Sequence, residues 1–120
     1  MRPRVFIWYG HHLFAKVMEP MLRREGMEVV GSTGLAGDAV TTVLAARPDV
    51  VVADRLIERE RPLGLLEIIR GSPRVRVLIL DLIEDEMRIY DGLGQEAVKL
   101  PSIIRAIEDA VHRRGLSLAG

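Results

Sequence analysis

The chain has 120 residues, of which 48% are hydrophobic and 28% charged, the balance of one globular domain. Its 17 basic and 17 acidic side chains cancel, which argues against a basic surface that binds nucleic acid or an anionic membrane. It has no cysteine, which excludes disulfides, thiol catalysis and cysteine-ligated metal.

We expect a single domain over residues 1–120, with a core from about 4 to 114 and a tail at 115–120. The first element, Arg4–Trp8, is a short apolar run typical of a strand buried on both faces. This run is too short for a signal peptide, and no other run is long enough to span a bilayer. We therefore expect a cytoplasmic protein.

Three elements follow in the first half of the chain. Apolar residues with helical spacing predict a helix over His12–Glu25. A second strand is predicted at Glu28–Gly31. Asp38 is a candidate N-cap for a helix that ends at Ala46, shortly before Pro48.

The middle of the chain contains the clearest strand, Asp49–Asp54, which is rich in β-branched residues. A very polar loop is expected at Arg55–Pro62, then a short helix at Leu63–Arg70. Another buried strand, Arg76–Leu80, ends at Asp81.

Three further elements complete the chain. A short helix is predicted at Glu84–Asp91, and a weak fifth strand at Glu96–Val98. The final helix is expected over Ser102–Arg114, with its isoleucines on one face.

Strands that alternate with helices predict a (βα)5 domain, a doubly wound parallel five-stranded sheet in a three-layer α/β/α arrangement. Ligands of such sheets bind at the carboxyl ends of the strands. The candidate site residues therefore follow the last apolar residue of a strand: Tyr9, Gly10, His11, Asp54, Asp81 and Lys99.

Two motifs in these positions resemble the receiver domain of two-component response regulators, a flavodoxin-like fold. The stretch Arg47–Asp54 resembles the strand that carries the phospho-accepting aspartate, and His11–Phe14 resembles the start of the first helix. Gly31–Leu44 also fits the receiver pattern, and the resemblance covers nearly the whole chain. It implies a role in signal transduction or a phosphorelay.

Residue by residue, the resemblance assigns the phospho-acceptor position to Asp54 and the lysine at the end of the fifth strand to Lys99. The chain departs from the receiver pattern at three further positions. Tyr9 and Gly10 stand where receivers have a pair of acids, and Asp81 stands where they have a hydroxyl residue. The resemblance is therefore to a degenerate receiver, or pseudo-receiver.

These departures remove the carboxylates that would hold Mg²⁺ for phosphoryl transfer. We expect no cofactor, and if a metal does bind, its ligands would be Asp54 and Asp81. A carboxylate at Asp81 would also repel a phosphoryl group. We instead expect a static cluster in which Lys99 pairs with Asp54 or Asp81 and the Tyr9 hydroxyl donates to a carboxylate.

Other site chemistries have less support in the sequence. His11 and His12 could begin a metal site, but adjacent helical residues point about 100° apart, so ordinary surface histidines are favoured. A small enzyme or ligand-binding protein using Asp54, Asp81, Lys99 and His11 lacks a nucleophile–base pair and a cofactor loop. We therefore expect no catalytic activity.

The leading hypothesis is a stand-alone receiver-like domain that regulates a signalling pathway through phosphate-independent contacts with a protein partner. The alternative is a functional receiver in which Asp54 accepts phosphate with an unusual Mg²⁺ shell. A homodimer is also expected, through the segment Met87–Leu93, whereas contacts with nucleic acid or membrane are not.

Overall fold

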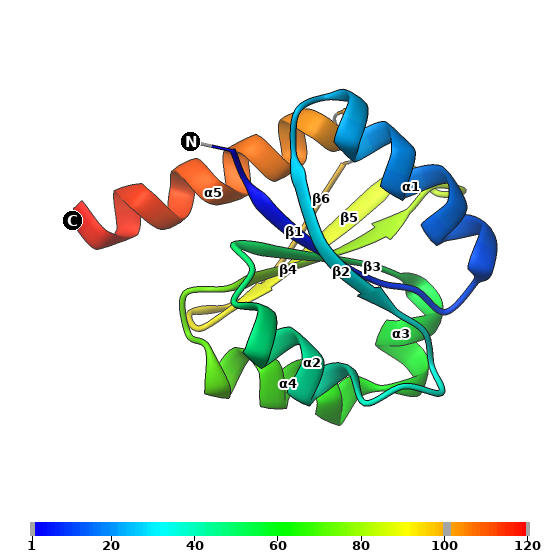
Figure 1. Cartoon of the computed structure of the whole chain (residues 1–120). Helices are drawn as coiled ribbons and strands as arrows, with labels where there is room; N and C mark the ends of the chain where they lie inside the picture. Colours follow the sequence, from blue (N-terminus) through cyan, green and yellow to red (C-terminus); the bar gives the residue numbers. More distant parts are fainter. Residues whose placement is uncertain (1, 100–101, 120) are drawn as a thin grey trace.

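The computed structural model describes residues 2–99 and 102–119, with side chains described up to residue 111. Six strands form one sheet in the order β2-β1-β3-β4-β5-β6 (Figure 1). The first four strands are parallel to one another, and the last two are antiparallel to their neighbours. The strands are β1 (Arg4–Trp8), β2 (Glu28–Thr33), β3 (Val50–Asp54), β4 (Arg76–Asp81), β5 (Glu86–Asp91) and β6 (Gly94–Lys99).

Helices cover both faces of the sheet, which gives the expected three layers (Figure 1). One face carries α1 (His12–Arg24) and α5 (Ile103–Ala119). The other face carries α2 (Ala39–Ala46), α3 (Arg55–Glu60) and α4 (Pro62–Gly71). No helix in the described part of the chain is long and apolar enough to cross a membrane.

The two central strands, β3 and β4, are buried along their whole length, as their continuous apolar sequences predict. Their side chains alternate between the two faces because successive residues of a strand point in opposite directions. Val52 and Leu78 pack toward α1 and α5, whereas Val51 and Ile79 pack toward α2, α3 and α4.

The prediction of five parallel strands is wrong after β4, although the α/β class is confirmed. The stretch predicted as a helix, Glu84–Asp91, forms a turn and then the antiparallel strand β5. Its side chains alternate with a period of two, since Met87 and Ile89 are buried in the core next to α1 and α5. The weak fifth strand is the antiparallel edge strand β6, so no fourth βα unit forms.

The helices differ from the prediction in two further places, one additional helix and one later helix end. The polar segment expected to be a loop contains α3, because Asp54 caps its first turn and Ile57 is buried in the core. The last helix, expected to end at Arg114, continues to Ala119 through the residues expected to form a tail.

Candidate functional site

Asp54 lies at the end of β3 and is only 6% exposed. One carboxylate oxygen, Oδ2, accepts hydrogen bonds from the backbone N–H groups of Gly10 and His11, both at 2.9 Å. The other, Oδ1, accepts from the N–H groups of Leu56 at 3.1 Å and Ile57 at 3.3 Å. A carboxylate has about four acceptor positions. Backbone donors therefore use the full acceptor capacity of Asp54.

Gly10 is required by this arrangement. A Cβ atom at this position would lie 2.5 Å from Leu56 Cβ and 2.7 Å from Asp54 Oδ1, closer than real Cβ contacts allow. The loop between β1 and α1 approaches Asp54 so closely that no side chain fits there.

Tyr9 does not take part in the expected cluster. Its ring lies against Gly34 and forms a tilted pair with His12, with ring centroids 5.2 Å apart. Within the described part of the chain, its hydroxyl donates to neither Asp54 nor Asp81, whose donors are other groups. The side chain of His11 is exposed, and its backbone is what holds Asp54.

Asp81, at the end of β4, accepts hydrogen bonds from the N–H groups of Ile83 and Glu84 at 3.1 and 3.0 Å. Its Oδ2 accepts from Nη1 of Arg55 at 2.8 Å. The Glu84 N–H and then the Arg55 guanidinium hold the pKa of the Asp81 carboxyl below its usual range, although burial acts in the opposite direction. The ionised carboxylate is therefore the form that this site stabilises.

Lys99 is not the cation of this cluster. It lies on β6 in register with Glu86, and within the described residues it forms no ion pair with Asp54 or Asp81. Arg55 occupies the place expected for it. Arg55 was not among the predicted site residues because the polar segment after β3 was expected to be a loop. The signal that could have identified Arg55 is Asp54 as the N-cap of a helix, since Arg55 is then the first residue of that helix.

A second polar group connects α3 to β5. Glu58 is largely buried and accepts hydrogen bonds from Nη1 of Arg88 at 2.7 Å and from the hydroxyl of Tyr90 at 2.6 Å. Nε of Arg55 also lies 3.6 Å from its carboxylate. Burial, and then the hydrogen bond to Glu58, raise the pKa of Tyr90 to about 12. These contacts join the end of β3 to the antiparallel strand.

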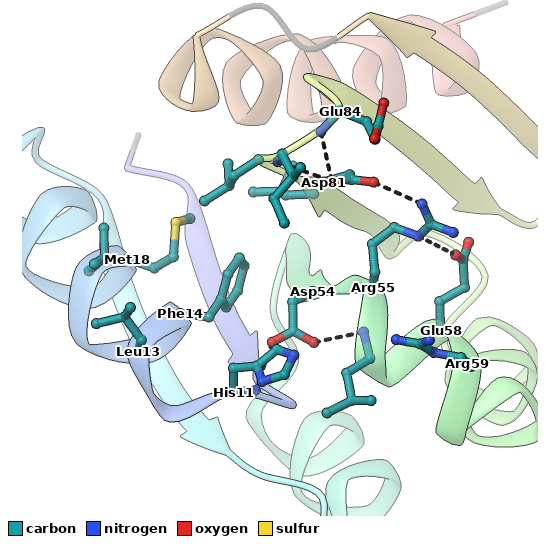
Figure 2. Close-up of a pocket in the computed structure, with 15 residues that line it drawn as sticks. His11, Leu13, Phe14, Met18, Asp54, Arg55, Glu58, Arg59, Asp81 and Glu84 are labelled. Atoms are coloured by element: carbon teal, nitrogen blue, oxygen red, sulfur yellow. Dashed lines mark hydrogen bonds and ion pairs between the residues drawn. The ribbon is translucent and has the colours of Figure 1, made fainter.

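A groove of about 870 Å³ lies over these strand ends, between α1, α3 and the turn that follows β4 (Figure 2). Arg55, Glu58 and Asp81 form one side, and Phe14 and Met18 of α1 lie on the opposite side in Figure 2. Large apolar side chains are exposed along it, notably Ile83 at 92% and Leu13 at 70%, followed by Leu82 and Val17. The groove is therefore largely apolar and open.

The donors around the two aspartates do not fit Mg²⁺. This ion prefers an octahedral shell of oxygens, including one or two carboxylates. Asp54 accepts from four N–H groups, and Asp81 is paired with Arg55. Within the described residues, no group of three or more His, Asp or Glu side chains is placed to hold a metal ion.

No protein-family model matches the sequence, and no curated protein matches it. Among solved structures, the crystal structure of the anti-anti-sigma factor PhyR from Bartonella quintana is similar, with a TM-score of 0.55 and 22% sequence identity. The match covers 66% of this chain and 33% of that chain, so this chain spans about a third of that protein. The similarity shows a shared fold, in agreement with the α/β fold expected from the receiver resemblance.

Proposed function

We propose that this chain is a non-catalytic, cytoplasmic receiver-like module that regulates a signalling pathway through protein contacts, without phosphorylation of Asp54. The observation that carries this proposal is the set of four backbone hydrogen bonds that Asp54 accepts. A receiver aspartate needs an oxygen that is free to attack a phosphoryl group and to coordinate Mg²⁺.

Phosphorylation would disrupt this arrangement. An acyl phosphate at either oxygen of Asp54 would displace N–H donors from an acceptor that is almost fully buried. Hydrogen bonds to a charged acceptor contribute about 1.5–3 kcal/mol each, so the loss would be substantial. The space beside Oδ1 is also limited, because even a methyl group at Gly10 would overlap it.

The groove is the surface that we assign to partner contacts. Four large apolar side chains along it are exposed: Leu13, Val17, Leu82 and Ile83. Apolar patches of this kind on a folded domain commonly mark protein interaction sites. PhyR is an anti-anti-sigma factor, and a regulatory protein with a similar fold supports the signalling role proposed for this chain.

The intact mass of the protein after incubation with acetyl phosphate and Mg²⁺ tests the first part of the proposal. We expect no gain of a phosphoryl group. A gain in the parent protein that is absent from Asp54→Asn would contradict the proposal and support the alternative, a working receiver with an unusual metal shell.

Site-specific photo-crosslinking in the host cell tests the second part. A photoreactive residue at Ile83, on the groove, is compared with one at Leu63, which is 71% exposed on α4. We expect a discrete adduct with a protein partner from position 83 and none from position 63. Equal labelling at both positions would show that the groove is not the contact surface.

A further inference from the structure

Among the residues that the structure describes, β6 is the last strand of the sheet and its outer edge pairs with no further strand. The residues of β6 are exposed, with only Val98 partly buried. The register with β5 is continuous from Gly94 to Lys99, without a bulge, and the strand contains no proline. Bulges and prolines are two of the features by which natural proteins protect strand edges.

The hairpin register determines which backbone groups point outward. Asp91 and Gly94 face each other across a two-residue turn, so they form a hydrogen-bonded pair. Pairs alternate along an antiparallel ladder. Glu96 and Val98 therefore also bond inward to β5. The N–H and C=O groups of the intervening residues point away from the sheet: Gln95, Ala97 and Lys99.

The helices leave room for another strand at this edge. On one face of the sheet, α5 packs mainly against β4 and β3. On the other face, α3 packs against the same two strands, and α4 packs against α2 and β4. The helical layers therefore cover little of β6, where only Val98 packs against the core next to α1 and α5.

We propose that two copies of this chain associate through antiparallel pairing of β6 with β6, with Ala97 on the twofold axis. In this register Ala97 faces its own copy, and Gln95 faces Lys99 on either side. Glu96 faces Val98. No two like charges stand directly opposite each other, and every outward backbone group of these residues has a partner.

Neighbouring registers are less favourable. Only shifts by two residues keep outward groups opposite outward groups. A shift in one direction sets the two Glu96 side chains opposite each other, which is destabilising. A shift in the other direction leaves Gln95 without a partner. The strand is therefore self-complementary in one register, which favours a second copy as its occupant.

The proposed dimer is independent of the proposed function. It forms at the end of the sheet beyond β5, whereas the groove lies at the ends of β1, β3 and β4. It also replaces the dimer surface expected from the sequence at Met87–Leu93. That segment contains β5, whose two edges are already paired with β4 and β6.

Sedimentation of the full chain over a range of concentrations, combined with a proline substitution, tests the pairing. Ala97→Pro removes an N–H that points outward, so the hairpin is retained while the edge loses a central donor. We expect the parent protein and Ala97→Ser, which keeps the N–H, to dimerise with increasing concentration. We expect Ala97→Pro to remain monomeric with an unchanged circular dichroism spectrum.

Disulfide trapping tests the register. The chain has no cysteine, so a single cysteine can react only with its own copy. Hydrogen-bonded pairs have Cα atoms about 5.5 Å apart, within the range that a disulfide spans. We expect Ala97→Cys to form a covalent dimer on mild oxidation, much faster than Leu93→Cys, which is 87% exposed at the hairpin tip.

Three results would overturn the proposal. The first is a parent protein that remains monomeric at the highest concentration reached, and the second is a dimer that Ala97→Pro leaves intact. The third is disulfide formation at equal rates from positions 97 and 93. In the second case the two copies would meet elsewhere, and the proposed function would be unaffected.

Discussion

The segments that follow β3 and β4 start with the same local structure and then continue differently. Each ends in an aspartate whose Oδ1 accepts hydrogen bonds from the N–H groups two and three residues further on. After Asp54 the chain continues as the helix α3. After Asp81 it makes a turn in which Asp85 adopts a left-handed conformation, with φ of 57°, and enters β5.

The local sequences at the two ends are nearly the same. Residues 54–58 read Asp-Arg-Leu-Ile-Glu and residues 81–84 read Asp-Leu-Ile-Glu. Yet Ile57 is completely buried, and Ile83 is 92% exposed. The cap is thus compatible with either continuation, and the apolar residues that come later decide between them. Leu65 and Ile68 of α4 extend the helical layer, whereas Met87 and Ile89 extend the sheet.

The second carboxylate oxygen also differs between the two ends. Oδ2 of Asp54 holds the loop between β1 and α1, through two N–H groups. Oδ2 of Asp81 holds Arg55, whose side chain is 46% exposed. Asp54 therefore joins backbone segments that are distant in the sequence, and Asp81 forms a weaker contact with a solvated side chain.

Removal of the Asp54 carboxylate should be the most destabilising of the changes proposed, and removal of the Asp81 carboxylate should cost less. Asp54→Ala leaves four N–H groups without their acceptor and should lower the free energy of unfolding by about 3 kcal/mol or more. Asp81→Ala should cost about 1–2 kcal/mol, because its Arg55 partner is partly solvated. Urea denaturation measures both. Equal losses would contradict the distinction between the two ends.

A methyl group at Gly10 tests how tightly the loop packs on Asp54. Gly10→Ala forces contacts at 2.5 Å with Leu56 and should cost about 2 kcal/mol. Gly26 is a suitable control because nothing lies within 4 Å of its Cβ position. Gly26→Ala should cost about 1 kcal/mol, from its positive φ alone. If Gly10→Ala lowers the unfolding temperature less than Gly26→Ala does, the loop at Gly10 does not pack closely on Leu56 and Asp54.

Glu58 connects α3 to the antiparallel strand β5, and its removal tests that contact. Glu58→Ala removes the acceptor of Arg88 and Tyr90 and should cost about 1–2 kcal/mol. Glu60→Ala, an exposed position on the same helix, should leave stability almost unchanged. The difference between their urea midpoints measures the connection, and identical midpoints would exclude it.

Low pH should weaken the end of β4. The pKa of Asp81 is lower in the folded protein than in the unfolded chain, so its ionised form stabilises the fold. That contribution is complete above the unfolded pKa, near 3.8, and is lost as pH falls through the folded pKa. The stability advantage of the parent over Asp81→Asn should therefore shrink in strong acid. An advantage that is constant with pH would mean that the folded protein does not favour the ionised form of Asp81.

The smallest change should be seen in the ultraviolet absorbance of Tyr90 as its phenol ionises. Tyr90 should ionise at about pH 12, two units above an ordinary tyrosine, because burial and Glu58 favour the neutral phenol. A raised pKa means that its contribution to stability is present below about pH 10 and is lost as pH rises toward 12. Ultraviolet titration of Tyr9→Phe reports Tyr90 alone. In Glu58→Gln, the transition should move to lower pH.

Sequence patterns predicted most of the first two thirds of the fold. The apolar strands β1, β3 and β4 and the helices α1, α2 and α4 occur close to their predicted positions, because long burial patterns have few alternatives. The strand-end positions of Asp54 and Asp81 followed from the same patterns. Their hydrogen-bond partners did not, because Gly10 and His11 are more than 40 residues from Asp54 along the chain.

The amino-acid sequence alone is therefore enough to predict a layered α/β domain with two carboxylates at adjacent strand ends. The tertiary structure was needed to establish that β5 is a strand. Glu84–Asp91 is short enough to suit a helical or a strand periodicity, and its pairing with β4 selects the strand. The tertiary structure was also needed to establish that Arg55, and not Lys99, pairs with Asp81. Both outcomes depend on which groups lie close in space, since hydrogen bonds and ion pairs act over a few ångströms and sequence distance does not measure that.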